Sequence, residues 1–394
     1  MKTLKRLLAL LLAILLLLSL SACAGKDEDD DEDEDRSGSS TRTSRKKEEK
    51  TVYEIAEITQ RSEVSYQDGS ETVSVVLYSY SEQGLITSVE TEIDGEERTV
   101  EITYQYDDRG TVSGFSGEID GAAVEVTIEN VYSGSRVTEA VISDVVLDGE
   151  SLKDRGALDT IDNDSSMVQL SMLLTAKRFV QNYIGYRDST VRVGDTGLLS
   201  RFEDGKLVYD YMRYPGFAQE TINEYDKGKT TTTVNTYNEI SGEKKLTVGI
   251  ITIINSKNQI VSVGGQVPDF VESIIVDLRF EEERDEETGD RIALSYIDED
   301  SVRCVLEEFE DELGDVEPEE IDEMLAMLHD YPLVRYTLDE KGKVIKTEIL
   351  VYQLMNNGQT NTTWYDEDGR VVRTESGTNI GNYKTLTVTE TKYR

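Results

Sequence analysis

The sequence predicts a mainly β fold (β+α), an antiparallel β-meander of repeated hairpins with a few added helices. Apolar and polar residues alternate with a period of two through much of the chain, as in TVEITYQY at residues 99–106. Asp-Gly pairs separate such runs, and they favour tight hairpins because both central residues of a type I′ turn need a positive φ. A 26-residue spacing between similar segments indicates that one hairpin design is repeated.

The repeat is visible in three copies. Tyr80, Tyr106 and Tyr132 align at this spacing, and the Asp-Gly pairs at 94–95 and 120–121 align with each other. One unit therefore holds two strands and two turns. Each hairpin reverses the chain and keeps its apolar side chains on one face, since a one-residue slip would move that face into water. We expect residues 51–160 to form this N-terminal β-hairpin repeat region.

The remaining residues, 161–394, predict an α+β region. Residues 166–184 carry two neighbouring apolar stripes at helical spacing, which predicts a helix lying on the sheet. The stripes contain Met167, Leu170, Leu174 and Ile184, and Met172, Ala176, Phe179 and Tyr183. Residues 302–330 predict a helical hairpin broken near Gly314 and Pro318, and strand patterns fill the rest.

Residues 1–22 have the pattern of a secretory signal peptide. Lys2, Lys5 and Arg6 precede fourteen uncharged, mostly apolar residues from Leu7 to Leu20. That run is shorter than the roughly 20 residues that a membrane-spanning helix needs. A charged start followed by a short apolar stretch therefore predicts export.

The residues LSAC at positions 20–23 resemble the lipobox of bacterial lipoproteins. The match is an aliphatic residue, two small residues and then Cys23. The resemblance implies cleavage before Cys23, lipid such as palmitate attached to its thiol, and a place on the extracytoplasmic face of the bacterial cell membrane. Acyl chains on Cys23 would hold the protein on a bilayer. An ordinary secretory signal that contains a cysteine is the alternative.

Residues 23–50 predict a lipidated, disordered, acidic tether. Nine consecutive acidic residues at 27–35 are followed by a Ser/Thr/Gly-rich stretch and a small basic cluster. The segment beyond Gly25 has no apolar residues to bury, so it is not expected to fold. It would space the folded body from the membrane.

The net charge limits the classes of binding partner, and the cysteine content limits the possible disulfides. Eighty acidic residues against 41 basic ones give a net charge of −39, so the chain should be repelled by nucleic acid and by anionic lipid. With Cys23 carrying lipid, Cys304 has no partner within the chain. We therefore expect no disulfide and interpret Cys304 as an incidental thiol.

The segment YDEDGRVVRTES at residues 365–376 resembles the YD or Rhs-type repeat of bacterial surface proteins. The match is an aromatic residue, Asp, two polar residues, Gly-Arg and alternating aliphatic residues. Looser copies occur at residues 106–110 and 338–342. The resemblance implies tandem β-hairpins in an exported protein, with carbohydrate contact as one use.

No catalytic, cofactor-binding or metal-ligating residues are expected. His329 is the single histidine, and its place in the last turn of an expected helix suits a cation near the helix C-terminus. A conventional Ser-His-Asp triad or a His-rich metal site is therefore not indicated. A glycoside hydrolase needs only two suitably spaced carboxylates, and the many acidic residues leave that alternative open.

The leading hypothesis is a non-catalytic protein that binds or scaffolds an envelope glycan, protein or lipid. Its 21 tyrosines could supply a contact surface or could fill the core and the strand edges. The alternative is a half-barrel carrier of lipid or another apolar ligand, with about fifteen strands and three helices. A continuous apolar cavity would favour the carrier, and a filled core would favour the binder.

Overall fold

The computed structural model describes residues 54–67, 69–119, 122–161, 165–184, 188–240, 243–266, 273–308, 322, 326, 331–350, 359–380 and 383–394. The signal peptide and the tether expected at residues 1–50 lie outside them. The mainly β prediction is confirmed, because these residues form 23 strands in one sheet together with helices α2 and α3. This is more strands than the fifteen that the sequence indicates.

The first nine strands are β1 (Ile55–Tyr66), β2 (Glu71–Tyr80), β3 (Ile86–Ile93), β4 (Glu96–Glu101), β5 (Thr103–Tyr106), β6 (Val112–Ile119), β7 (Ala122–Ser133), β8 (Arg136–Leu147) and β9 (Glu150–Ser151). After α2 (Met167–Ile184) come β10 (Ser189–Val193), β11 (Leu199–Glu203), β12 (Lys206–Tyr214), β13 (Phe217–Asp226), β14 (Lys229–Ile240), β15 (Glu243–Asn255), β16 (Ile260–Gln266), β17 (Ile274–Arg284) and β18 (Arg291–Ile297). After α3 (Glu299–Glu308) come β19 (Val334–Leu338), β20 (Val344–Ile349), β21 (Thr360–Tyr365), β22 (Val371–Ile380) and β23 (Tyr383–Tyr393).

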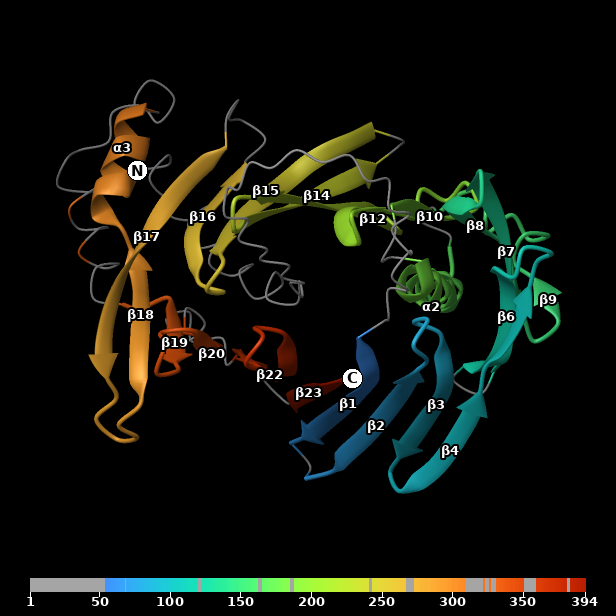
Figure 1. Ribbon diagram of the computed structural model, residues 1–394, viewed down its shortest axis with the longest axis horizontal. Coiled ribbons are helices and arrows are strands. Elements are labelled where there is room, and N and C mark those ends of the chain that lie inside the picture. The colour runs from blue at the N-terminus through green and yellow to red at the C-terminus, as the bar shows by residue number, and fades with distance from the viewer. Residues whose placement is uncertain are drawn as a thin grey trace, which may run out of the picture.

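The strands close into a ring (Figure 1). Most strands pair with their neighbours in sequence, and three features close the circuit. β1 pairs with both β2 and β23, which joins the two ends of the described chain. β8 pairs in parallel with β10. Finally, β4 pairs with β3 and β5 pairs with β6. The segment from Glu96 to Tyr106 therefore joins the two sides of the sheet, since its first part pairs with β3 and its last part pairs with β6. The hairpin region and the α+β region thus share one sheet.

The Asp-Gly turns have the backbone geometry that the sequence predicts. Asp94 has a φ of 50° and Gly95 a φ of 85°, and Asp204 and Gly205 have φ values of 50° and 75°. Two successive positive φ values define a type I′ turn, whose twist matches that of the flanking strands. The pair at 120–121 lies outside the described residues.

A second kind of turn recurs five times, at Ser81–Leu85, Asp107–Thr111, Asn255–Gln259, Asp339–Lys343 and Asp366–Arg370. In each, a side-chain oxygen of the first residue accepts the backbone N–H groups two and four residues later. Two of the five are the looser YD-like copies and one is the best copy. The hydrogen bonds of this turn are sufficient to produce the shared motif.

All five turns lie at the same end of the ring, which we call the turn rim. This follows from the alternating strand directions, and hydrogen bonds between turns agree with it. Asn258 donates to the carbonyl of Gly369 at 3.0 Å, and Lys343 donates to that of Glu367 at 2.8 Å. The described chain also begins and ends here, because the N–H of Arg394 donates to the carbonyl of Glu54 at 2.8 Å.

α2 confirms the helix expected at 166–184 and lies inside the ring (Figure 1). Its residues Leu170, Leu173 and Phe179 are buried in a core with inward side chains of β6 to β8, β10 and β11. Phe115 on β6 stacks on Phe179 at 5.3 Å between ring centroids. The stripe that contains Leu170 and Leu174 packs against the core as expected, but the assignment of Met167 to it is wrong, since Met167 is 63% exposed; Leu173, which the stripes omit, is buried.

α3 confirms the start of the helical hairpin expected at 302–330, with Val302 and Val305 buried. Most of that hairpin's second half lies outside the described residues. A second packed region lies at this side of the ring around Tyr336 on β19, which is fully buried and accepts the N–H of Ile260 at 3.0 Å. Burial raises the pKa of Tyr336.

Candidate functional site

Of the reactive residues that the sequence singles out, only Cys304 lies in the described part of the chain. Cys23 and His329 lie outside the described residues. Cys304 is a free, exposed thiol on α3. In the described part of the chain, no three His, Cys, Asp or Glu residues are arranged to hold a metal ion. Neither described helix is long and apolar enough to cross a bilayer.

Uncharged polar side chains cover the inward face of five adjacent strands. We call this surface the neutral inner face. It consists of Thr72 and Ser74 on β2, Gln60 and Ser62 on β1, Thr385, Thr387 and Thr389 on β23, Thr374, Ser376 and Thr378 on β22, and Asn361 and Thr363 on β21. No Asp, Glu, Lys or Arg lies on this face of the five strands, although 31% of the whole chain is charged.

Strand register places these side chains in rows. Ser62 is opposite Ser74 on one side and Thr387 on the other, and Thr387 is opposite Ser376. Paired residues share a face of the sheet because side chains alternate along each strand. The Oγ atoms of Ser62 and Thr387 are 3.5 Å apart. The row therefore crosses four strands as a continuous line of hydroxyl groups.

The burial of neighbouring residues identifies this face as the inward one. Ile58 on β1 and Tyr78 on β2 lie on the same face of the sheet as the neutral inner face. They are opposite each other in register and pack against the core around α2. The inward face thus changes character along each strand. It is apolar where it meets the core, and beyond the core it carries uncharged polar groups interrupted by Val64 on β1 and Val76 on β2.

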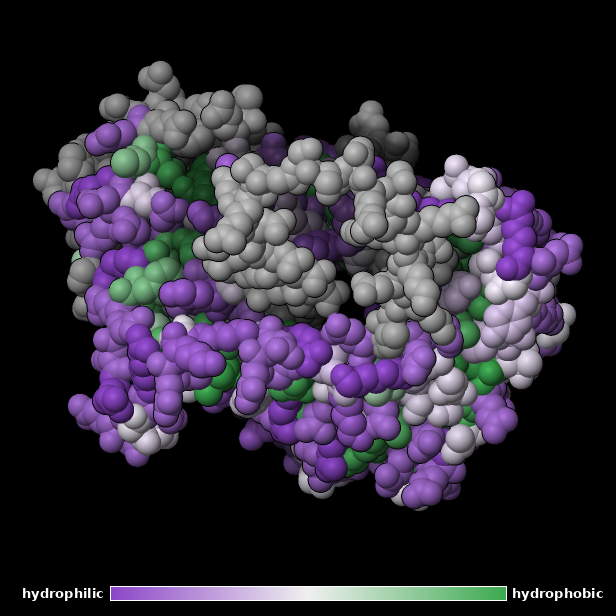
Figure 2. All heavy atoms as spheres, viewed as in Figure 1, coloured by the Kyte–Doolittle hydropathy of each residue, from purple (hydrophilic) through white to green (hydrophobic). Residues whose placement is uncertain are grey.

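The outward face of the same strands carries the charges. Arg61 pairs with Glu63 at 2.7 Å, and Arg373 pairs with Glu390 at 2.7 Å. Lys392 also pairs with Glu57. Hydrophilic residues accordingly cover much of the described surface in Figure 2. Charge is therefore sorted by face, with ion pairs outside and neutral groups inside.

Trp364, the single tryptophan, lies within this outward charged layer. The ammonium of Lys346 lies 5.5 Å from its ring centroid and the guanidinium of Arg373 lies 5.4 Å from it. Both residues are opposite Trp364 in strand register. Cations over an indole face are attracted by its quadrupole, so the triad ties β20, β21 and β22 together.

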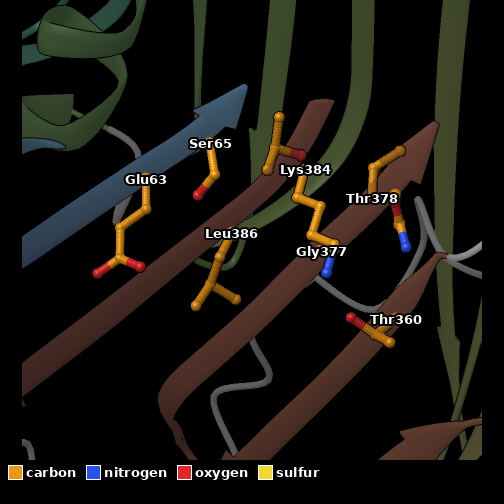
Figure 3. A pocket seen from close by; sticks show the side chains of 9 residues that line it. Glu63, Ser65, Thr360, Gly377, Thr378, Lys384 and Leu386 are labelled. Atoms are coloured by element: carbon orange, nitrogen blue, oxygen red, sulfur yellow. The ribbon is translucent and has the colours of Figure 1, made fainter. Parts of the chain in front are cut away.

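A cavity of about 290 Å³ opens on the outward side of β1 and β21 to β23. Gly377 forms part of its wall, and Thr360, Leu386, Glu63 and Lys384 surround it (Figure 3). A Cβ on Gly377 would lie 2.7 Å from Oγ1 of Thr360. The missing side chain therefore creates the hollow, whose polar, widely open walls give it no enclosed ligand site.

Two clusters combine burial with shifted pKa values. Burial first, and then the hydrogen bond to Glu220, raise the pKa of Tyr237 to about 12 and also raise that of Tyr209. Tyr237 and Tyr209 donate to the two carboxylate oxygens of Glu220 at 2.7 and 2.9 Å. This cluster crosses β12 to β14 on the outward face, and hydrogen bonding to two phenols holds the carboxylate in place.

The second cluster lies inside the ring, where α2 meets β11 and β12. Burial lowers the pKa of Lys177, which pairs with Asp210. Ser200 also donates to Asp210, and Gln181 is hydrogen-bonded to Ser200. Each polar group meets another polar group of the cluster, so its arrangement positions α2 rather than offering a free nucleophile or base.

The tyrosines divide between structural and exposed roles. Tyr336 is buried, and Tyr104 donates to the carbonyl of Ile86 at 2.8 Å from within the core. Tyr66 and Tyr383 are opposite each other at the ends of β1 and β23 and are 49% and 43% exposed. Sequence reasoning missed the neutral inner face, although TLTVTET at 385–391 already places threonine at every second position.

No protein-family model matches the chain, and no curated protein matches it in sequence. Three solved structures resemble it weakly. A porin-like protein from Bacteroides uniformis is 10% identical, with 86% of this chain and 98% of that chain covered and a TM-score of 0.21. A mutant porin from Rh. blastica is 7% identical, with coverages of 86% and 99% and a TM-score of 0.21.

The third is the outer membrane protein opdK from Pseudomonas aeruginosa, 8% identical, with coverages of 86% and 99% and a TM-score of 0.15. At these identities and TM-scores, the likenesses carry no inference about what this chain does.

Proposed function

We propose that the chain is a bacterial lipoprotein, anchored through lipid on Cys23 at the extracytoplasmic face of the cell membrane, with a binding role rather than a catalytic one. The apolar run at residues 7–20, the lipobox-like residues 20–23 and the acidic tether support export and anchoring. The binding role rests on the distribution of charge in β1, β2 and β21 to β23, where charged side chains lie on the outward face and uncharged polar side chains lie on the inward face.

The outward charges support a body that stands beside the membrane. Arg61 and Glu390 lie on the outward face, and each side chain is about half exposed. Lys392 lies on the same face and is more exposed than either. Moving such groups into hydrocarbon would remove their water shells, which is unfavourable even for paired charges. The lipid on Cys23, rather than the sheet, would then hold the protein at the bilayer.

The neutral inner face supports binding without catalysis. Hydroxyl and amide groups such as those of Ser376 and Gln60 donate and accept hydrogen bonds but do not titrate near neutral pH. General acid-base work needs groups that do. A glycoside hydrolase would also need two carboxylates facing each other, and this face of β1, β2 and β21 to β23 carries none.

The composition of the interior favours a polar ligand over the apolar cargo of a carrier. Beside α2 the described interior is filled by buried side chains such as Leu173, Phe115 and Ile142. Beyond that core the inward face presents hydroxyl groups. A hydrocarbon chain placed there would leave those groups without hydrogen-bond partners, which is unfavourable.

The anchor is tested on the full chain expressed in a bacterial host. Metabolic labelling with a palmitate analogue should label the protein, and mass spectrometry should find Cys23 as the modified N-terminal residue. Cys23→Ala should abolish the label and release the protein from washed membranes. Cys304→Ser is the matched control and should retain both. An unmodified Cys23 in membrane-bound protein would refute the anchor.

A further inference from the structure

Two exposed tyrosines stand at one end of the neutral inner face. Tyr66 and Tyr383 are directly opposite each other in the pairing of β1 with β23. They lie on the same face of the sheet as Ser62 and Thr387. Both side chains are close to half exposed, at 49% and 43%. A tyrosine offers a flat apolar ring together with a polar hydroxyl, so the pair forms an amphipathic platform.

The middle of the neutral inner face is also open to solvent. Gln60 and Ser376 are exposed, whereas Ser62, Thr385 and Thr387 between them are half-buried. An inward face sealed by packed core would show neither exposed residue. A ligand that reaches the tyrosine pair can therefore continue along β23 and β22 over hydroxyl groups, with the apolar Val64 on β1 beside Thr385 as the first residue past the rings.

The chemistry of this surface selects an uncharged, hydroxyl-rich ligand. Each serine or threonine hydroxyl can rotate to donate or accept, as a sugar hydroxyl can, so the two kinds of group are matched partners. A cationic ligand would find no carboxylate on this face to pair with. An anionic ligand would approach a chain whose net charge is −39.

We propose that the neutral inner face binds a neutral glycan, with a sugar ring resting on Tyr66 and Tyr383 and the chain extending toward Gln60 and Ser376. This inference rests on the proposed binding function and names its ligand class. The sugar's apolar face covers the tyrosine rings, and its hydroxyl groups exchange water for the hydroxyl and amide groups of the strands.

The position of the tyrosine pair suits a ligand outside the membrane. The described part of the chain begins at Glu54, on the turn rim, and Tyr66 ends β1 at the opposite rim. The 12 residues of β1 span roughly 40 Å at about 3.3 Å per residue. A tether that joins the body at Glu54 would therefore hold the tyrosine pair on the far side from the anchor.

Affinity electrophoresis of the purified full-length protein tests this proposal. Native gels would contain a neutral β-glucan, a neutral α-glucan, chitin oligosaccharides immobilised on the matrix, or polygalacturonate as the anionic comparison. The double variant Tyr66→Ala/Tyr383→Ala removes the platform, and Ser376→Asp places a charge on the neutral inner face. Arg61→Ala and Lys384→Ala alter the outward face of the same strands and are the matched controls.

At least one neutral glycan should retard the native protein and both control variants, whereas polygalacturonate should not. The tyrosine double variant and Ser376→Asp should each weaken retardation at least tenfold while keeping the native circular dichroism spectrum. Retardation by no neutral glycan would overturn the proposal, and so would equal loss in the control variants. Membrane attachment is measured separately through the Cys23 label, so failure of the anchor and failure of glycan binding are distinguishable.

Discussion

Lys177 on α2 and Asp210 on β12 meet inside the ring, with the ammonium nitrogen 2.6 Å from a carboxylate oxygen. The side chain of Lys177 is 3% exposed and that of Asp210 is 15% exposed. Burial lowers the pKa of Lys177, and the charge of Asp210 acts in the opposite direction. The pair fixes α2 against the sheet at a buried point, where either charge without its partner would be destabilising.

Lys177→Met should therefore lower the free energy of unfolding by about 3–5 kcal/mol, because it leaves the carboxylate of Asp210 buried without a cation. Urea denaturation followed by circular dichroism measures the change. Removing both charges, in Lys177→Met/Asp210→Leu, should recover part of the loss. Lys392→Met breaks the exposed pair with Glu57 and should have a much smaller effect. Equal losses at Lys177 and Lys392 would contradict the assignment of a buried pair.

Alkaline pH should destabilise the ring through its hydrogen-bonded tyrosines. Burial, followed by the hydrogen bond to Glu220, raises the pKa of Tyr237 to about 12 from 10.0. Between those values the folded state retains a proton that the unfolded chain has lost, so stability should fall as the pH rises. Urea midpoints measured from pH 9 to pH 11.5 should decline, and Tyr237→Phe should make the decline shallower. An unchanged slope in Tyr237→Phe would show that another group controls the effect.

The five repeated turns should depend on an acceptor at their first position rather than on its charge. Oδ1 of Asp366 accepts the N–H groups of Asp368 and Arg370 at 3.0 and 2.9 Å. Asp366→Ala removes both bonds, together with the ion pair between Oδ2 of Asp366 and Nε of Arg370 at 2.8 Å, and should lower the free energy of unfolding by about 1–2 kcal/mol. Asp366→Asn keeps an acceptor, as Asn255 does in the same turn, and should lose less. Thermal denaturation compares the two variants, and equal destabilisation would argue against this role.

Gly264 on β16 should tolerate no side chain. A Cβ there would overlap the carbonyl oxygen of Ile274 on the paired strand β17, and backbone atoms cannot move aside alone. Gly264→Ala should lower the free energy of unfolding by about 1–3 kcal/mol or more. At Gly249 on β15 the nearest obstacle is the side-chain oxygen of Asn235, which can rotate away. Gly249→Ala should therefore be milder in the same urea denaturation assay, and the reverse order would be inconsistent with this account.

Local features of the fold could be predicted from the sequence because their causes are local. Asp94-Gly95 and Asp204-Gly205 adopt type I′ geometry since the residue types themselves tolerate positive φ. α2 could be predicted from its apolar spacing alone. Most of its buried residues, such as Leu170 and Phe179, could be predicted too, but Met167 is apolar and lies beyond the core, whereas Leu173 is buried in it.

Closure of the ring and the neutral inner face could not be predicted for the opposite reason. The pairing of β1 with β23 joins Ile55 to Tyr393, and alternation within each strand carries no information about so distant a partner. Without closure, the threonines at 385, 387 and 389 resemble an ordinary solvent-facing set. Only the continuous register from Ile58 and the core around α2 identifies them as inward-facing.

The closed circuit also affects how copies of the protein can coexist at high density. Among the described strands, all except β4, β5 and β9 pair with a strand on each side over at least part of their length, and β4 and β5 each complete part of the seam. A free edge presents unpaired N–H and C=O groups that another chain can extend into an aggregate. The proposed anchor on Cys23 would confine the protein to two dimensions, where it would meet its own copies constantly. Here the closed circuit leaves only short unpaired edges in the described residues, so crowding should nucleate less intermolecular β-structure than an open sheet of the same length would.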